Sequence, residues 1–243
     1  MAIASFTGCG ADPNDQPNVD QWRVDGGPQR RHTLTMEPGL TTRELTADLW
    51  PDLEALFGGN GACGGCWCMF WRQERGEDWS ETKGAVNRRR FRALVEGGRA
   101  HGVLAYVDGM PVGWAAFDRR RELAKLDRAP TLACDDADRV WSLPCFFVKA
   151  GYRRRGVASA LIAAAVAAVR RHRGTVIEAY PVRPGKFGKS IPAAFAWTGT
   201  IPMFEAAGFT PVGDRGRGKQ RMRLAGKAPG GAGRRKQHRK MPL

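Results

Sequence analysis

Apolar residues recur along the chain with two periods, one typical of strands and the other typical of helices. Short apolar or alternating runs predict strands at residues 41–45, 102–107, 110–117, 140–148, 175–182, 209–212 and 220–224. Apolar residues spaced three or four positions apart predict helices at residues 46–57, 80–96, 157–171 and 201–207. Asp108-Gly109 separates two apolar runs, which is typical of a two-residue β-hairpin turn.

Polar residues at the ends of these segments predict where two of the helices begin. Thr46 or Asp48 is expected to cap the first helix, with Pro51 in its first turn, and Ser80 is expected to cap the second. The buried sides are expected to comprise Leu49, Leu53, Leu56 and Phe57 in the first helix, and Val86, Arg90, Phe91, Leu94 and Val95 in the second.

The order of these elements is β-α-α-β-β-β-α-β-α-β-β, which predicts an α/β fold. We expect helices packed on a mixed, mainly antiparallel sheet in a single domain at residues 41–225. Residues 1–40 are rich in Gly, Pro, Asp, Asn and Gln without a sustained period, so they are predicted to be a disordered extension. Residues 119–138 are polar and predict a surface excursion with a short helix.

Length and hydropathy exclude a membrane-spanning protein. Among the 243 residues no run approaches the roughly 20 apolar positions that a membrane helix needs. The amino-terminal residues lack the basic region and long apolar run of a signal peptide. A soluble, cytoplasmic protein is therefore expected, and its six cysteines are expected to be reduced thiols.

The net charge of +15 is concentrated near the carboxyl end of the chain. Residues 214–243 contain eleven lysines and arginines against a single acidic residue, which is two thirds of the excess. Residues 226–243 are predicted to be a basic, disordered tail. Such a tail is either a solvated end or a surface that attracts nucleic acid or other acidic partners. It contains no aromatic residues of the kind that stack on single-stranded nucleic acid.

Residues 145–171 contain the most informative pattern in the chain. A short apolar run is followed by a turn with Gly151 and three consecutive arginines, and then by an alanine-rich helix. The first N–H groups of a helix have no partner within the helix, and its dipole is positive at that end. A strand that enters a helix through a basic, glycine-containing turn is therefore predicted to bind phosphate.

The sequence from Arg153 to Ala158, RRRGVA, matches the Q/R-x-x-G-x-G/A signature, and Val148 lies five residues before it. The sequence from Phe204 to Phe209 is similar to an aromatic-x-x-x-Gly-Phe helix end. With these features residues 41–224 resemble the GNAT superfamily of N-acetyltransferases. The resemblance implies that acetyl-CoA is the cosubstrate. It also implies a cofactor site formed by Phe146, Phe147, Val148, Arg153, Arg154, Arg155, Gly156, Val157, Ala158 and Ser159.

The reaction implied by the resemblance is direct attack of a primary amine on the thioester in a ternary complex. A backbone N–H near Phe146 or Phe147 is the expected donor to the carbonyl oxygen. Many members of the family place a tyrosine where this chain has Phe204, which has no proton to give to the leaving thiolate. The catalytic candidates are Tyr180 and Ser142 as acids and Glu178 as general base, although Glu178 is equally expected as an edge or surface carboxylate.

Residues 58–72 combine a glycine-rich loop, a C-x₂-C-x-C arrangement and a dense group of aromatic residues. A zinc site usually needs four ligands in two separated pairs, and no second pair follows Cys63, Cys66 and Cys68, so no metal is expected. By analogy with the family these residues either form the acceptor site or pack in the core. The acceptor-site candidates are Cys66, Trp67, Cys68, Phe70, Trp71 and, from the loop at residues 183–199, Trp197.

Two other classes of function stay open alongside the enzyme. A protein with this fold could bind acyl-CoA as a sensor or binding module without turnover, or associate with nucleic acid through the basic tail. The sequence identifies neither the acceptor amine nor the oligomeric state. A small amine, an antibiotic, a peptide amino terminus and a protein lysine are all open as acceptors.

Overall fold

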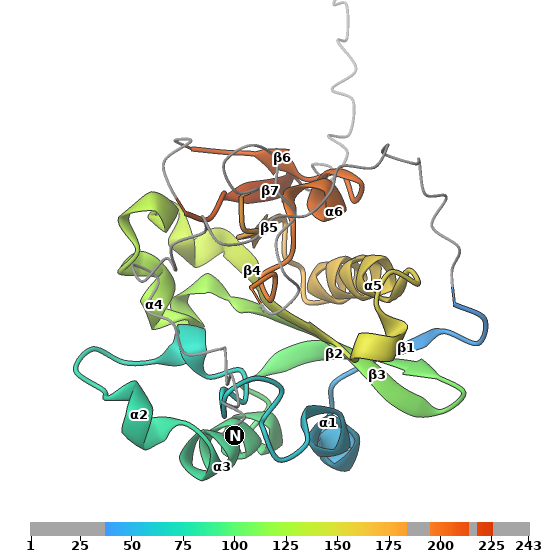
Figure 1. The fold of residues 1–243 in the computed structure, drawn as a ribbon. Helices are drawn as coiled ribbons and strands as arrows, with labels where there is room; N and C mark the ends of the chain where they lie inside the picture. Colours follow the sequence, from blue (N-terminus) through green and yellow to red (C-terminus); the bar gives the residue numbers. More distant parts are fainter. Residues whose placement is uncertain (1–36, 184–194, 214–217, 226–243) are drawn as a thin grey trace, which may run out of the picture.

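The computed structural model describes residues 37–183, 195–213 and 218–225, and these form one seven-stranded sheet between two layers of helices (Figure 1). The strands lie in the order β1-β2-β3-β4-β5-β7-β6, and each neighbouring pair is antiparallel except β4 and β5. The predicted α/β class with a mixed, mainly antiparallel sheet is confirmed. The strands are β1 (Thr41–Glu44), β2 (His101–Val107), β3 (Met110–Arg119), β4 (Val140–Val148), β5 (Val176–Ala179), β6 (Thr210–Pro211) and β7 (Met222–Ala225).

The long helix α5 (Val157–Arg171) covers one face of the sheet, and α1 (Trp50–Phe57) and α3 (Ala85–Glu96) cover the other (Figure 1). Each face has its own cluster of buried apolar side chains. In the described part of the chain no helix is both long and apolar enough to cross a bilayer. The shorter helices are α2 (Trp79–Thr82), α4 (Ala124–Asp127) and α6 (Ile201–Glu205), with 3₁₀ turns at Ala47–Leu49, Phe70–Arg72, Arg120–Glu122, Pro130–Leu132, Ala137–Arg139 and Ala150–Tyr152.

An irregularity in the central strand β4 decides which of its side chains face which layer. The pairing of β4 with β3 slips between Ala116 and Asp118. Proline has no N–H to donate to a neighbouring strand and is therefore disfavoured in a central strand. Pro144 is tolerated in β4 because it lies at this irregularity. Beyond it Phe146 joins the α5 cluster, whereas Cys145 and Phe147 pack against the α1 and α3 cluster. The irregularity therefore turns the Cys145 thiol toward the layer that contains residues 58–72.

The first predicted helix is present, but neither expected cap makes a side-chain capping bond. A 3₁₀ turn precedes α1, and Thr46 before that turn makes no such bond. Pro51 does lie in the first turn of α1, where its missing N–H costs nothing.

The second predicted helix, at residues 80–96, is wrong as a single element because it divides into α2 and α3. Gly84 separates them with a φ of 79°, and its N–H donates to the Gly65 carbonyl at 2.8 Å. Asp78, and not Ser80, caps α2, because its carboxylate accepts from the Ser80 N–H at 2.7 Å. Arg90, predicted on the buried side, is exposed and forms an ion pair with Glu77.

The hairpin predicted at Asp108-Gly109 joins β2 to β3, with positive φ values of 49° and 77° that suit a type I′ turn. The excursion predicted at residues 119–138 is only partly a surface feature. Leu123, Leu126 and Leu132 are buried in a third apolar cluster with Trp71 and Tyr180. Arg120 at its start is wholly buried.

The disorder predicted for residues 1–40 and 226–243 lies almost entirely outside the described residues, as does most of the loop predicted at 183–199. Of the predicted extension only residues 37–40 are described. Within this segment the Glu37 N–H donates to the Arg155 carbonyl at 3.1 Å, and Leu40 packs on the α5 cluster. The amino-terminal end of the described chain therefore lies against the turn that begins α5.

Candidate active site

The turn between β4 and α5 has the geometry that its sequence predicts. Arg154 and Gly156 both adopt left-handed backbone conformations, with φ of 64° and 79°, and Gly156 is the residue before α5. No acidic residue lies in the first turn of α5 to compete for its free N–H groups. The Arg153 Nε donates to the Val148 carbonyl at 3.0 Å, which closes the turn on the end of β4. This end of α5 can therefore receive a pyrophosphate.

Gly113 on β3 allows α5 to begin close to the sheet. A Cβ at this position would lie 2.8 Å from Val157 Cγ1 and 3.1 Å from Leu161 Cδ1. The first turn of α5 thus packs directly on the backbone of β3 at Gly113. The positions of its N–H groups depend on this contact.

β4 and β5 pair in parallel only over the first part of β4, from Val140 to Leu143. Beyond that point the segment from Trp197 to Thr200 lies between the two strands. The Phe146 N–H donates to the Trp197 carbonyl at 2.6 Å, and the Val182 N–H donates to the Gly199 carbonyl at 3.1 Å. We call this the bridging segment. Thr198 within it is wholly buried, and its hydroxyl has no hydrogen-bond partner among the described residues.

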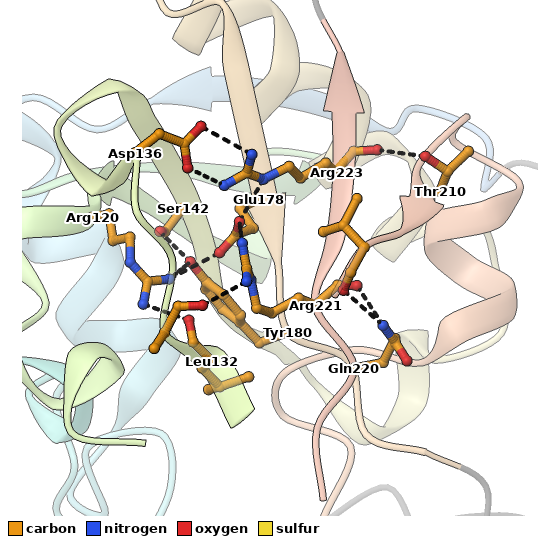
Figure 2. A network of polar contacts seen from close by, with 12 residues as sticks. Arg120, Leu132, Asp136, Ser142, Glu178, Tyr180, Thr210, Gln220, Arg221 and Arg223 are labelled. Carbon is orange, nitrogen blue, oxygen red and sulfur yellow. Dashed lines mark hydrogen bonds and ion pairs between the residues drawn. The ribbon is translucent and has the colours of Figure 1, made fainter. Parts of the chain in front are cut away.

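The three catalytic candidates, Ser142, Glu178 and Tyr180, lie together in a buried polar network (Figure 2). Glu178 Oε1 accepts from Arg120 at 2.9 Å, and Oε2 accepts from Arg221 at 3.0 Å and Arg223 at 2.7 Å. Both carboxylate oxygens are therefore engaged by guanidinium groups.

Tyr180 continues the same network toward β4. Its hydroxyl accepts from Arg120 at 2.9 Å and lies 2.7 Å from Ser142 Oγ. Burial, with the Glu178 charge beside it, raises the pKa of Tyr180 far above its ordinary value. The Ser142 and Tyr180 hydroxyls are thus bound to each other and to Arg120 inside the protein.

The aromatic residues predicted to line an acceptor site divide between two places. Phe70, Trp71 and Trp197 pack together, with ring centroids 5.1–5.7 Å apart, and Trp71 also contacts Tyr180 at 6.3 Å. Trp67 instead packs between Trp50 and Phe57 in the core and is 3% exposed. We call Phe70, Trp71, Trp197 and Tyr180 the aromatic cluster.

The expectation that all six cysteines are reduced is wrong for Cys63, which is disulfide-bonded. Cys66 and Cys68 are free thiols and meet a third, Cys145, on β4. Cys68 has a positive φ of 54°, accepts a hydrogen bond from Trp114 Nε1 at 3.0 Å and interacts with Cys145. The hydrogen bond from Cys145 lowers the pKa of Cys68, and the same bond together with burial raises the pKa of Cys145. Burial also raises the pKa of Cys66, to about 12. The described residues contain no group of three or more His, Cys, Asp and Glu side chains arranged to hold a metal ion.

Four cations at this site lie outside the sequence-based set of site residues. Arg120 belongs to the predicted surface excursion, and Lys219, Arg221 and Arg223 enter the sequence analysis only in the charge count over residues 214–243. In the structure the last three lead into and occupy β7, at alternate positions, and the two arginines reach the Glu178 network (Figure 2). A period of two over residues 219–223 was the available signal.

Lys219 lies close to the bridging segment. Its backbone bridges to Val182, and its Nζ lies 4.8 Å from the centroid of the Trp197 ring. Burial lowers the pKa of Lys219 from its ordinary 10.5 to about 8, and its interaction with Cys145 opposes this shift. A lysine in this state exchanges its proton near neutral pH.

A family model described as "Acetyltransferase (GNAT) family" matches residues 68–185 of the chain. This range contains β4, β5, the turn between β4 and α5, and most of the network residues. No curated protein sequence matches the chain significantly.

Several solved structures resemble the chain in fold. A histone acetyltransferase HPA2 and related acetyltransferase from Corynebacterium glutamicum is 18% identical, with 79% of this chain and 98% of that chain covered and a TM-score of 0.48. A ribosomal-protein-alanine N-acetyltransferase from Brucella melitensis is 18% identical, with 76% and 99% covered and a TM-score of 0.46. The PaiA N-acetyltransferase from Thermoplasma acidophilum, solved with coenzyme A, is 11% identical, with 76% and 98% covered and a TM-score of 0.43.

Proposed function

Because the chain belongs to the GNAT family of acetyltransferases, we propose that it transfers the acetyl group of acetyl-CoA to a primary amine by direct attack in a ternary complex. The observation that carries this proposal is the basic turn at the start of α5, which follows the part of β4 that no longer pairs with β5. A basic turn at the end of a strand that has parted from its neighbour suits a long cosubstrate with a pyrophosphate at one end.

The phosphates are proposed to bind at the amino terminus of α5. The backbone N–H groups of its first turn and the exposed arginines before it supply donors and positive charge. Arg155 is already paired with Glu37, at 3.2 Å, so Arg153 and Arg154 are the freer cations. The proposed cosubstrate site comprises Phe146, Phe147, Val148, Arg153, Arg154, Arg155, Gly156, Val157, Ala158 and Ser159.

The thioester carbonyl is proposed to accept a hydrogen bond from the Phe146 N–H. A fixed donor stabilises the negative charge that develops on this oxygen as the amine attacks. The Trp197 carbonyl occupies this donor in the structure, so it must leave when the thioester binds. The bridging segment is therefore proposed to move as the cosubstrate enters between β4 and the end of β5.

The acceptor is proposed to approach from the layer that contains residues 58–72. The candidates on this side are Cys66, Cys68, Phe70, Trp71 and Trp197, and Trp67 lies deeper in the core. Rings around an amine can exclude water and hold the nitrogen close to the thioester, and positioning alone supplies much of the rate. Aromatic faces also attract cationic ammonium groups.

A second function, acyl-CoA binding without turnover, is favoured by one observation. The Phe146 N–H already has a partner within the chain, and Phe204 beside it carries no exchangeable proton, with its ring 5.7 Å from that of Phe146. A protein that keeps this closed arrangement would bind CoA phosphates but would not polarise a thioester.

Substitution of Gly156 tests the proposed cosubstrate site. Gly156→Glu is expected to abolish acetyl-CoA binding in calorimetry, because it adds bulk and negative charge beside the phosphates. Gly156→Asn, which tolerates the positive φ and adds no charge, should weaken binding less. Gly59→Glu is the matched control, since it adds the same charge to an open loop. Unchanged affinity in a folded Gly156→Glu variant would refute the site.

Turnover is tested by release of the CoA thiol with a panel of primary amines. The panel should contain spermidine, tyramine, an aminoglycoside, a peptide with a free amino terminus and a peptide with an internal lysine. Thiol release with at least one amine supports the enzyme. Tight acetyl-CoA binding without release from any of them supports the binding module.

A further inference from the structure

We propose that the amine of Lys219 gives the leaving CoA thiolate its proton and recovers a proton from the attacking amine. This inference rests on the proposed acetyl transfer and deepens it by naming the group that handles the proton. It follows from the position of Lys219, its surroundings and the state of the other candidates.

Both neighbours of the Lys219 amine adjoin the proposed thioester site. The Trp197 ring lies 4.8 Å from Nζ, and the carbonyl of the same residue accepts the Phe146 N–H. Lys219 interacts electrostatically with the Cys145 thiol. Cys145 directly precedes Phe146 on β4. The amine thus faces the side of β4 from which the acceptor is proposed to arrive.

The surroundings of Lys219 leave its amine free to exchange a proton. No ion pair or hydrogen bond joins it to a carboxylate in the described chain. The elements around it contribute Cys145 from β4, with Cys68 and Cys66 behind it, and Arg183, whose guanidinium donates to Gln220 at 2.6 Å. Burial without a counter-ion lowers the pKa of Lys219 to about 8, close to that of an ordinary thiol.

The chemistry balances with this single group. The amine nitrogen forms a bond to the carbonyl carbon, the carbon–sulfur bond breaks, and its electron pair goes to sulfur. The Lys219 ammonium transfers a proton to that sulfur, and the neutral lysine then accepts the surplus proton of the new amide nitrogen. The enzyme ends with the protonation it began with. Transfer between groups of similar pKa is the condition in which acid–base help is efficient.

The other candidates are less suited to this role in the structure. Glu178 is engaged by three guanidinium groups, and the Tyr180 hydroxyl is bound to Ser142 and Arg120 with its pKa raised by burial. Phe204 has no proton. Among these described groups Lys219 alone is both uncommitted and titratable near neutral pH.

The test compares Lys219→Met, Lys219→Arg and wild type, with Lys125→Met as the matched control. Lys125 is the other lysine over a ring of the same region, 3.9 Å from the Phe70 centroid, but it lies on α4. The probes are acetyl-CoA with the most reactive amine of the panel, and acetyl-CoA with hydroxylamine, which is already neutral at pH 7. Calorimetric affinity for acetyl-CoA, kcat and KM are measured from pH 6 to 10.

Lys219→Met is expected to lower kcat by about 10²-fold, at the lower end of general acid–base contributions, and to leave acetyl-CoA affinity unchanged. With hydroxylamine the wild-type kcat should fall above pH about 8 as the ammonium is lost, and this fall should be absent in Lys219→Met. Lys219→Arg should also be slow, because a guanidinium does not release its proton in this range. Lys125→Met should behave as wild type.

A purely structural role would affect stability and leave the pH profile of kcat unchanged. The unfolded chain binds the Lys219 proton more tightly than the folded one, so wild-type stability should rise between pH about 8 and 10.5, and Lys219→Met should lack this rise. A Lys219→Met variant as fast as wild type at every pH, or full activity in Lys219→Arg, would overturn the inference and leave the proposed acetyl transfer unaffected. Wild type that does not bind acetyl-CoA would instead refute the proposed function itself.

Discussion

Glu178 shows how its neighbours determine what a buried carboxylate can do. Its side chain is wholly buried and accepts hydrogen bonds from Arg120, Arg221 and Arg223. A charge in a protein interior is tolerated only when it is paired and hydrogen-bonded. We interpret Glu178 as the counter-ion that holds β5, β7 and the 3₁₀ turn at Arg120 together, although the sequence also allowed it to be a general base.

Glu178→Gln separates these two roles. Removal of the charge leaves the guanidinium groups without their shared partner, and breaking a buried pair costs about 3–5 kcal/mol. We therefore expect a large fall in the free energy of unfolding, measured by urea denaturation, and a change in kcat of less than about tenfold at a temperature where the variant is folded. A base would give the opposite pattern, with a kcat loss of roughly 10²–10⁴-fold at nearly unchanged stability.

Asp127→Asn is the control for this network. Asp127 accepts from the same Arg120 at 2.8 Å, but its side chain is 51% exposed. Water can replace a half-exposed carboxylate as a partner of Arg120, so the loss should be similar to the roughly 0–1 kcal/mol of surface pairs and this variant should remain close to wild type. A destabilisation as large as that of Glu178→Gln would show that burial of the carboxylate is not the cause.

At the scale of elements, the start of α5 depends on close packing against β3 at Gly113, where the strand has no side chain. Gly113 lets Val157 and Leu161 approach β3, and the same first turn of α5 carries the proposed phosphate donors. The affinity for the cosubstrate and the packing of the helix are therefore linked through one position.

Gly113→Ala is expected to destabilise the fold by about 1–3 kcal/mol, because the new methyl group overfills the contact at 2.8 Å. It should also weaken acetyl-CoA binding by about tenfold or more, which corresponds to about 1.4 kcal/mol. Thermal unfolding and calorimetry measure the two effects. Gly59→Ala meets open space at an ordinary φ and should change neither quantity. Full affinity in a destabilised Gly113→Ala variant would show that the donors do not depend on this contact.

At the scale of the whole molecule, the positive charge divides into two parts. Lys219, Arg221 and Arg223 belong to the folded domain, where the two arginines are paired with Glu178 and Arg223 also with Asp136. The remaining basic residues beyond β7 lie outside the described residues. The attraction to acidic partners predicted from net charge therefore concerns a smaller surplus than the sequence count implies.

A chain that ends at Gly226 is expected to unfold within about 2 °C of the full chain, because the removed residues have no apolar period and β7 is kept. Its turnover of small amines should be unchanged. Differential scanning calorimetry and thiol release measure these quantities. A large fall in melting temperature would show that the tail packs on the domain. Loss of activity on a macromolecular acceptor alone would indicate that the tail docks that acceptor.

Most of the secondary elements and the conformation of the turn before α5 follow from the sequence alone, because they depend on neighbours within a few positions. Three local patterns agree with the fold. They are the spacing of the apolar residues, the Asp-Gly pair at the hairpin, and the order of strand, arginines, glycine and helix around the turn before α5. The same locality explains two errors. Ser80 and Asp78 are both good caps, and Gly84 could not be read as a break without its contact to Gly65.

The candidate site was only partly predictable, because its polar groups are brought together by pairing between distant segments. Arg120 meets Glu178 across 58 positions, and Arg221 and Arg223 meet it across 43 and 45. The alternation over residues 219–223 indicates a strand there, but no local pattern indicates that these arginines meet a buried carboxylate. Lys219 acquires its lowered pKa only when β7 folds against β5 and Trp197 covers its amine. Burial and partner choice are properties of the assembled sheet, and a one-dimensional pattern does not contain them.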